Sequence, residues 1–222
     1  MIVDVRRYTL KPGKLAPYLE QYGSLGYKTQ SKHLGSALGW FISDVGPQNH
    51  VMHLWGYSEA ADMERKRSSM ASDPAWVEIR KNFKGLFAAQ ETEIMRVIPN
   101  LPFTSAANVP GLVDIRFYTL HHGQLQSFLD FLVTRSALIQ ARHWTDNIIY
   151  LVSQSGYQNR IMHIWGHSNH AERLSRRGSL LADPDWQDCM KTFLPMFEDM
   201  RTFTAIPATF WKRQAMEVNY DL

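Results

Sequence analysis

The stretch NHVMHLWGYS, residues 49–58, recurs as NRIMHIWGHS, residues 159–168, at an offset of 110 positions. The same offset aligns VDVRRYTLKPGKL, which begins at Val3, with VDIRFYTLHHGQL, which begins at Val113, and eight of these thirteen positions are identical. A fixed period of this length indicates a duplicated unit whose elements have kept their lengths. The sequence predicts four parts: a first repeat (1–99), a linker (100–111), a second repeat (112–207) and a C-terminal tail (208–222).

One repeat contains the signals for four strands and two helical regions. The motif SDP at 72–74 restarts the second helical region, because Asp73 suits an N-cap and Pro74 suits the first helical position. The resulting order, βαββαβ, is typical of a ferredoxin-like unit with both helices on one face of its sheet. Alternation of apolar and polar residues predicts strands at 3–10, 38–45, 50–57 and 92–98, and helical spacing predicts helices at 14–29 and 58–70.

The strand residues alternate between an aliphatic side and a side of charged and aromatic residues. In the first strand Val3 and Val5 share one side, and Asp4, Arg6 and Tyr8 share the other. We expect the aliphatic side to face the helices. The other side then needs a cover, and the equivalent side of the second repeat can provide it. The predicted fold is therefore α+β, with two ferredoxin-like repeats packed sheet to sheet as a pseudo-dimeric α+β barrel.

The charged and aromatic side supplies the candidate site residues, which we expect to line the space between the two sheets. A histidine beside an arginine and a tyrosine suits proton transfer next to a carbonyl, because the cation stabilises the resulting anion. Structural roles remain open, since the arginines can pair with Asp4 and Asp114, and the histidines can bond to a carbonyl or an acid. The predicted catalytic residues are His53, His163, Arg6, Arg116, Tyr8 and Tyr118, and the predicted substrate-binding residues are Trp40, Trp55, Trp165, Tyr150 and Asp44.

Composition excludes several classes of protein. The 222 residues are 45% hydrophobic and 20% charged, as in a globular chain, and the basic residues behind the net charge of +3 are dispersed. We therefore expect no nucleic-acid partner. No apolar run approaches the roughly 18 residues that span a bilayer. The single cysteine, Cys189, excludes an intrachain disulfide, and the amino terminus has no signal-peptide pattern, so we predict a cytoplasmic protein without membrane contact.

Three motifs together resemble the NIPSNAP family: VDVRRYTLKPGKL from Val3, HLGSALGWFISDVGPQNHVMHLWGYSEAADMERKR from His33, and DPAW from Asp73. The resemblance covers both repeats. It implies a dimeric α+β barrel with both halves in one polypeptide, and we expect a homo-oligomer. Related barrels include cofactor-independent monooxygenases, haem-binding and haem-degrading proteins and small-molecule isomerases, but the family supplies no established catalytic residues. In the second repeat KPG becomes HHG at 121–123, which suggests that the two halves are no longer equivalent.

The sequence supports three functional hypotheses. The first is a protein that binds or transforms a small apolar or aromatic metabolite, by cofactor-independent proton transfer or oxygenase chemistry. The second is a non-catalytic interaction protein with a filled barrel, and the third is a haem-binding protein. A cavity of roughly 300 Å³ or more favours the first. No cofactor or metal is predicted, because the sequence lacks HExxH and Cys-x-x-Cys-His motifs and because His33 and His143 suit helix ends better than haem iron.

Overall fold

The computed structural model describes residues 1–101, 111–144 and 147–211. In the first repeat a π-helical turn, η1 (Tyr22–Gly26), joins α1 to α2. The strands of this repeat are β1 (Ile2–Leu10), β2 (Gly39–Val45), β3 (His50–Tyr57) and β4 (Phe87–Val97), and its helices are α1 (Leu15–Gln21), α2 (Tyr27–Leu34), α3 (Ala60–Ala71) and α4 (Pro74–Asn82).

The second repeat has the same order of elements. A π-helical turn, η2 (Leu132–Ser136), again interrupts the first helical region, and a 3-10 turn, η3 (Leu194–Met196), precedes the last strand. The strands of this repeat are β5 (Leu112–Leu120), β6 (Asn147–Ser153), β7 (Arg160–His167) and β8 (Phe197–Pro207), and its helices are α5 (Leu125–Phe131), α6 (Ala137–His143), α7 (His170–Ala182) and α8 (Pro184–Phe193).

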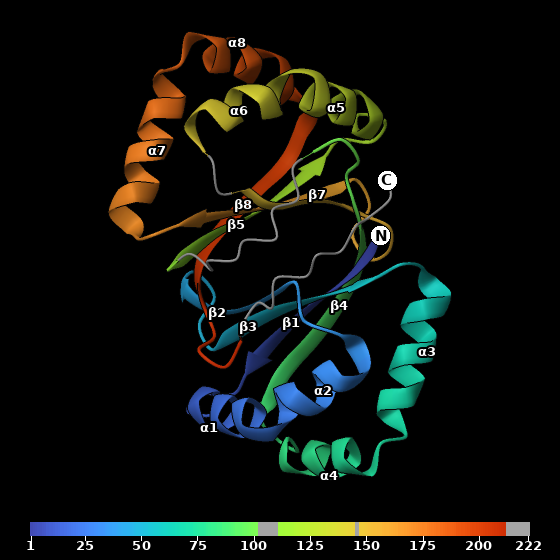
Figure 1. The fold of residues 1–222 in the computed structure, drawn as a ribbon. Coiled ribbons are helices and arrows are strands. Elements are labelled where there is room, and N and C mark those ends of the chain that lie inside the picture. The colour runs from blue at the N-terminus through green and yellow to red at the C-terminus, as the bar shows by residue number, and fades with distance from the viewer. Residues whose placement is uncertain (102–110, 145–146, 212–222) are drawn as a thin grey trace.

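The two sheets close into one barrel through their edge strands. The strand order is β1-β3-β2-β8-β5-β7-β6-β4, and β4 pairs back onto β1. The repeats meet where β2 pairs with β8 and where β4 pairs with β6, both antiparallel. Figure 1 shows the two sheets at the centre with the helices of each repeat on opposite outer sides. Closure leaves no free sheet edge, and the predicted pseudo-dimeric α+β barrel is confirmed.

The sides of the strands that carry Val3, Val5 and Ile115 face into the barrel, together with Phe117 and the Arg7–Glu93 ion pair, so the predicted orientation of the strand faces is wrong. One hydrophobic cluster joins Val3, Val5 and Leu54 of the first repeat to Ile115 and Ile164 of the second. All five side chains are buried almost completely. The aliphatic sides of the two sheets therefore face each other, and the charged and aromatic sides face outward, towards the helices.

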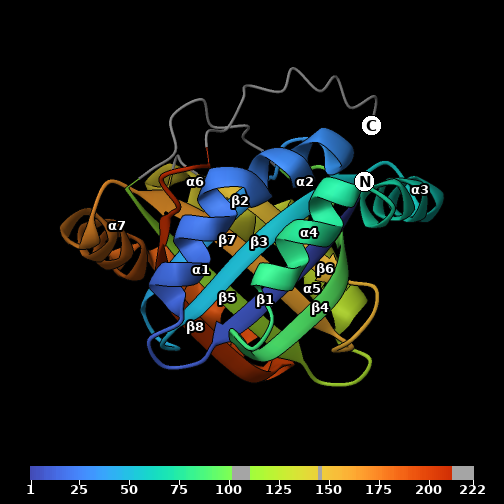
Figure 2. The same cartoon turned by 90° about the horizontal axis from the view of Figure 1, so that it is seen from below.

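The charged and aromatic side of the first sheet packs against aromatic residues of its own helices. Trp40 on β2 stacks on Tyr18 of α1 with the ring centroids 6.3 Å apart, and it lies 5.2 Å from Tyr22. Figure 2 shows α1, α2 and α4 lying across this sheet. Strand alternation separates two faces but does not say what covers each one. The aliphatic residues suit the narrow interior of an eight-stranded barrel, where Phe117 and Phe203 also lie, and the tryptophans and tyrosines suit the wider space under the helices.

Local signals at the helix ends agree with the structure, and one strand is longer than predicted. The Asp73 carboxylate accepts a hydrogen bond of 2.8 Å from the Ala75 N–H and so caps α4. β4 begins at Phe87, before the predicted start at 92, because it pairs with β1 as far as Leu10. Within the described ranges no helix is both long and apolar enough to cross a membrane. Residues 102–110 and 212–222, most of the predicted linker and tail, lie outside the described residues.

Candidate functional site

A cavity of about 910 Å³ lies between the sheet of the first repeat and its helices. Arg6, Tyr8 and His53 form its floor, and the antiparallel register of β1 and β3 brings them together because Arg6 lies opposite His53. The volume is in the range of small-molecule sites. The other lining residues come from the helices, from the segment after α4 and from β4: Tyr18, Tyr22, Gln30, Arg67, Met70, Ala71, Trp76, Val77, Arg80, Lys81, Phe83, Lys84, Gly85, Phe87 and Gln90.

A buried carboxylate, Asp4, anchors the floor of this cavity. It accepts a hydrogen bond of 2.8 Å from Arg6 Nε and another from the Thr92 hydroxyl, and Arg67 Nη2 lies 3.3 Å from it. Burial alone would lower the pKa of Arg6, but Tyr8 and Asp4 raise it. The Arg6–Asp4 ion pair that the sequence left as an alternative is therefore present. Because two guanidinium groups share one carboxylate, the floor still carries net positive charge.

His53 is a neutral hydrogen-bond donor rather than a base. Its side chain is almost fully buried, and Trp55 Nε1 donates a hydrogen bond of 2.7 Å to its Nδ1. An indole can only donate, so the proton of the neutral imidazole is on Nε2, which has no partner among the described residues. Burial and then the charge of Arg6 lower the pKa of His53 well below its ordinary value. The Nε2–H is therefore a buried donor without a partner among the described residues, on a side chain that lines the cavity.

Tyrosine hydroxyls add further neutral donors. The Tyr22 hydroxyl donates to Gln30 Oε1, and the Tyr8 ring meets His53 edge-on at a centroid distance of 5.0 Å. Burial, more than any other cause, raises the pKa of both Tyr18 and Tyr22 well above the ordinary value, so both keep their protons. The interior of the cavity therefore combines aromatic walls, neutral hydroxyls and the His53 N–H with the guanidinium groups of Arg6 and Arg67.

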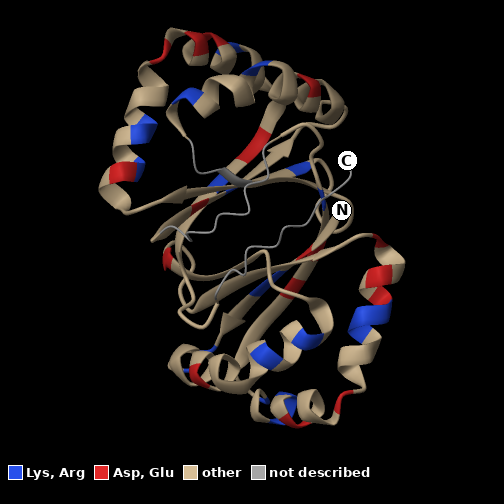
Figure 3. Cartoon of the chain, viewed as in Figure 1, with Lys and Arg blue, Asp and Glu red and all other residues tan. Residues whose placement is uncertain are grey.

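The mouth of the cavity is basic. Arg67, Arg80, Lys81 and Lys84 line it, and Figure 3 shows basic segments on α3 and α4. No carboxylate lines the cavity in the part of the chain that the structure describes. Lys81 pairs at 2.6 Å with Glu78, but both side chains are exposed, so solvent weakens this pair. The field of the mouth therefore attracts anions.

The second repeat has a smaller cavity, of about 120 Å³, in the equivalent place. Arg116, Tyr118 and His163 line it as their counterparts line the first cavity. At the positions of Tyr18 and Tyr22 it has Phe128 and Leu132, so it lacks those two hydroxyls. Burial, reinforced by Arg116, lowers the pKa of His163 to about 3. The two repeats thus offer related but chemically different pockets.

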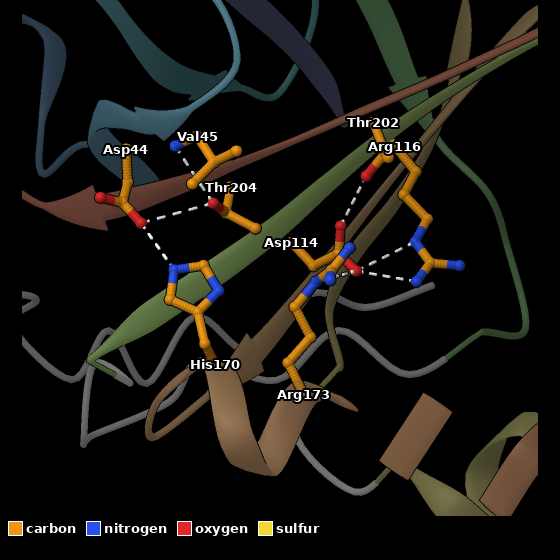
Figure 4. Close-up of polar contacts among 8 residues, drawn as sticks. All are labelled: Asp44, Val45, Asp114, Arg116, His170, Arg173, Thr202 and Thr204. Carbon is orange, nitrogen blue, oxygen red and sulfur yellow. Dashed lines mark hydrogen bonds and ion pairs between the residues drawn. The ribbon is translucent and has the colours of Figure 1, made fainter. Parts of the chain in front are cut away.

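The carboxylate below this second cavity, Asp114, accepts more hydrogen bonds than Asp4. Figure 4 shows Arg116, Arg173 and Thr202 converging on it. Its oxygens accept hydrogen bonds of 2.7 Å from Arg116 Nη2, 2.9 Å from Arg173 Nε and 2.7 Å from the Thr202 hydroxyl. Burial alone would raise the pKa of Asp114, but Arg116, Thr202 and Arg173 together lower it to about 2. Arg173 stands where the first repeat has Met63, so the Arg173 contact is specific to the second repeat, whereas in the first repeat Arg67 is the second arginine beside the carboxylate.

Comparison with known proteins identifies the family. A model of the NIPSNAP family matches residues 3–102 and 113–212. The chain belongs to the NIPSNAP family. It is similar to Protein NipSnap of Drosophila melanogaster, at 17% identity over 95% of this chain and 78% of that protein, and to human Protein NipSnap homolog 3A, at 23% over 93% and 83%. A monooxygenase-like protein of Fusobacterium nucleatum shares the fold at 9% identity, with a TM-score of 0.68 over 93% of this chain and 92% of that one.

Most of the residues predicted for the NIPSNAP site lie at or directly behind the two cavities. Trp40 stacks on His53 with the ring planes 4° apart and the centroids at 5.5 Å. In the second repeat Tyr150 meets His163 edge-on at 4.4 Å, and Trp165 lies 5.3 Å from Tyr150. These rings support the cavity histidines from behind and do not line the cavities themselves.

Asp44 lies outside both cavities, contrary to its predicted place in the site. Its carboxylate pairs with His170 Nε2 at 2.7 Å and lies 3.5 Å from the Thr204 hydroxyl, at the seam of the repeats (Figure 4). The pairing of β2 with β8 shifts register between Ser43 and Val45, so the simple alternation from which the position of Asp44 was predicted does not hold there.

His33 and His143 hold helices together in both NIPSNAP repeats. His33 Nε2 lies 2.8 Å from Asp73 Oδ2 and its Nδ1 lies 3.0 Å from Ser69 Oγ. His143 makes the equivalent contacts with Asp183 and Ser179, each at 2.8 Å. Both ring nitrogens are engaged, so neither histidine offers a free nitrogen to haem iron. Among the described residues no group of three or more His, Cys, Asp or Glu could hold a metal ion.

The residues that the helices contribute to the first cavity were not predicted from the sequence. Tyr18, Tyr22, Gln30 and Arg67 are polar or aromatic residues on helix faces that we expected to pack against an aliphatic sheet. Two hydroxyls and an amide on one buried helix face are a signal for a polar pocket, because buried polar groups need partners. That signal is present in the sequence and identifies Tyr22 and Gln30, which bond to each other.

The described part of the C-terminal tail docks on the first repeat. The ring of Phe210 lies 4.9 Å from Trp40 and 5.5 Å from Tyr22, and Trp211 Nε1 donates a hydrogen bond of 3.1 Å to the Ala37 carbonyl.

We expect Phe210→Ala to lower the free energy of unfolding by about 2 kcal/mol, because it removes a partly buried ring that packs on Trp40 and Tyr22. Urea unfolding measures the change. Leu138→Ala, at an exposed position, is the control and should change it by less than about 0.5 kcal/mol; equal effects would contradict the docking.

Proposed function

We propose that this NIPSNAP protein binds a small aromatic molecule with one anionic oxygen, such as a carboxylate, phenolate or enolate, in the cavity of the first repeat. The single observation that carries the proposal is the lining of that cavity. It combines aromatic walls, a basic mouth and the unpaired N–H of His53, and no carboxylate lines it in the described chain.

The roles of the residues follow from their protonation and position. The His53 Nε2–H and the guanidinium of Arg6 are the groups that would hold the anionic oxygen, since charge-assisted hydrogen bonds are the strong ones. Tyr8, Tyr18 and Trp76 would enclose the ring. The same donors would stabilise an oxyanion that develops during proton transfer. A compound whose own O–H or C–H is acidic suits this cavity best, because the lining offers donors and no carboxylate base.

Binding of 2-naphthoate to the full chain, measured by isothermal titration calorimetry, tests the proposal. We expect His53→Phe to weaken binding by about tenfold, because it removes a hydrogen bond to a charged oxygen and keeps a ring of similar size. The matched variant His163→Phe makes the same change in the other repeat and should leave the affinity unchanged. Thermal unfolding checks that both variants remain folded.

Two outcomes would overturn this assignment. Equal binding of the neutral analogue 2-naphthalenemethanol would show that the anionic oxygen is not recognised. Equal effects of the two histidine variants would show that the first cavity is not the site.

The alternative of a non-catalytic protein is supported by one observation, the dense packing of buried side chains inside the barrel. The two hypotheses differ in whether the bound molecule undergoes proton transfer. An enolisable aromatic ketone, 2-tetralone, distinguishes the two hypotheses. Proton-transfer chemistry would speed the exchange of its α-hydrogens in D₂O, and NMR measures this exchange. Exchange at the uncatalysed rate in the presence of a saturating protein concentration would favour binding without chemistry.

A further inference from the structure

The mouth of the second cavity is apolar where the mouth of the first is basic. Met190, Leu194 and Met200 replace Arg80, Lys84 and Gln90 at equivalent positions. Leu194 and Met200 are 43% and 52% exposed, and Leu181 beside them is 44% exposed. Large apolar side chains gathered at one opening lose the stabilisation that burial would give, and such a patch typically marks a binding surface.

The helix side of the same cavity carries a cation from α7, at the position that Arg67 occupies in the first repeat. Asp114 is already bonded to Arg116 and Arg173, as shown in Figure 4. Arg177 also lines the cavity, and within the described ranges it has neither an ion pair nor a hydrogen bond. Burial, followed by the charges of Arg116 and Arg173, lowers the pKa of Arg177, so an anion bound beside this guanidinium would stabilise its charge.

A histidine without a hydrogen-bond partner among the described residues lines the same cavity. His163 is 2% exposed, and among the described residues neither of its ring nitrogens has a hydrogen-bond partner. A buried polar group without a partner costs free energy that a ligand can recover. His163 lines the cavity, so its unpaired N–H and the Arg177 guanidinium would be offered to the same occupant.

The size of the cavity limits what fits inside. A volume of about 120 Å³ corresponds to about four water molecules at about 30 Å³ each, which accommodates an acidic head group and the first few carbons. Any longer part of the ligand must lie across the rim of Leu181, Leu194 and Met200. An acidic head and an apolar tail therefore match the interior and the rim respectively.

We propose that the second repeat carries a separate site for a monocarboxylate amphiphile of the fatty-acid type. Its carboxylate binds Arg177 and the His163 N–H, and its hydrocarbon tail covers the exposed rim. The site is distinct from the aromatic-anion cavity of the first repeat, and it does not depend on the function proposed for that cavity.

Titration of the full chain with decanoate, below its micelle concentration, tests the head-group contact. We expect Arg177→Gln to weaken decanoate binding by about tenfold or more, because it removes a charge-assisted hydrogen bond. His53→Phe, in the other cavity, should leave decanoate affinity unchanged. The neutral analogue 1-decanol and the cation decyltrimethylammonium should bind at least about tenfold more weakly than decanoate.

Exchange of rim residues between the repeats tests the tail contact. The double variant Leu194→Lys/Met200→Gln gives the second rim the residues of the first, and we expect it to weaken decanoate binding. The reciprocal variant Lys84→Leu/Gln90→Met changes only the first rim and should not. Urea unfolding of each variant confirms that the fold is retained.

The proposal is overturned if Arg177→Gln binds decanoate as the natural chain does, if 1-decanol binds equally well, or if His53→Phe is the variant that weakens binding. These results are independent of the naphthoate experiment, in which His53→Phe is the sensitive variant. Failure of one site is therefore distinguishable from failure of the other.

Discussion

Asp114→Ala is expected to lower the free energy of unfolding by about 3 to 5 kcal/mol, because it breaks a buried ion pair by removing one partner. The Asp114 carboxylate is fully buried and accepts hydrogen bonds from Arg116, Arg173 and Thr202. Without it, two guanidinium groups remain close together with no counter-charge, and Arg177 lines the same cavity. Urea unfolding at pH 7 measures the loss.

A second strand pair of the same spacing provides the control. Asp199 pairs with Arg201 Nε at 2.6 Å, so the two residues are two positions apart, as are Asp114 and Arg116. Both Asp199 and Arg201 are exposed, so Asp199→Ala is expected to cost less than about 1 kcal/mol. Similar costs for the two substitutions would show that burial of Asp114 is not what makes its ion pairs important.

The fold was predictable because it depends on periodic signals. The offset that aligns Val3 with Val113 runs through both repeats, so the elements of one repeat predict those of the other. Alternation in β1 correctly separates Val3 and Val5 from Asp4 and Arg6. Alternation does not show which face of the sheet points into the barrel, because both faces are covered in this fold and both can be buried. That choice depends on the volume of side chains inside a closed barrel, which is a property of all eight strands together.

The part of the candidate site that lies on paired strands was predictable from the sequence. Arg6 and His53 come together because they are directly opposite on paired strands. Tyr18, Tyr22 and Arg67 join them only through the rotation of the helices over the sheet, which a single sequence does not fix. The tautomer of His53 likewise depends on one contact, the Trp55 N–H on Nδ1, that has no sequence pattern.

The duplication explains why the chain can hold two different sites. Each repeat supplies four of the eight barrel strands. Residues between its sheet and its helices can therefore differ between the repeats without a change in β1 or β5. Met63 became Arg173 and Lys84 became Leu194 between otherwise equivalent helical regions. These changes move positive charge from the mouth of one cavity to the floor of the other. A fused pair of repeats can carry this asymmetry, which two identical chains cannot.

Lowering the pH from 7 to 5 is expected to reduce the free energy of unfolding by about 4 kcal/mol through His53 and His163 alone. Each of these histidines contributes about 2 kcal/mol, because the unfolded chain binds a proton near pH 6.5 and the folded protein does not. The pKa of His163 is lowered to about 3 and that of His53 lies well below its ordinary value, chiefly through burial. The sign follows directly: this stability is present above pH 6.5 and is lost as the pH falls towards the folded-state pKa values.

The two single variants separate this effect from other titrating groups. His50 and His167 also have lowered pKa values and add to the loss, whereas burial raises the pKa of Glu93 and offsets part of it. Asp114 adds nothing in this window, since its pKa of about 2 and the ordinary carboxyl value both lie below pH 5. His53→Phe and His163→Phe should each reduce the difference between pH 7 and pH 5, measured by urea unfolding, by about 2 kcal/mol. A difference that stays the same in both variants would mean that the two rings titrate alike in the folded and unfolded chain, and that His53 does not hold its Nε2–H as a neutral donor by burial.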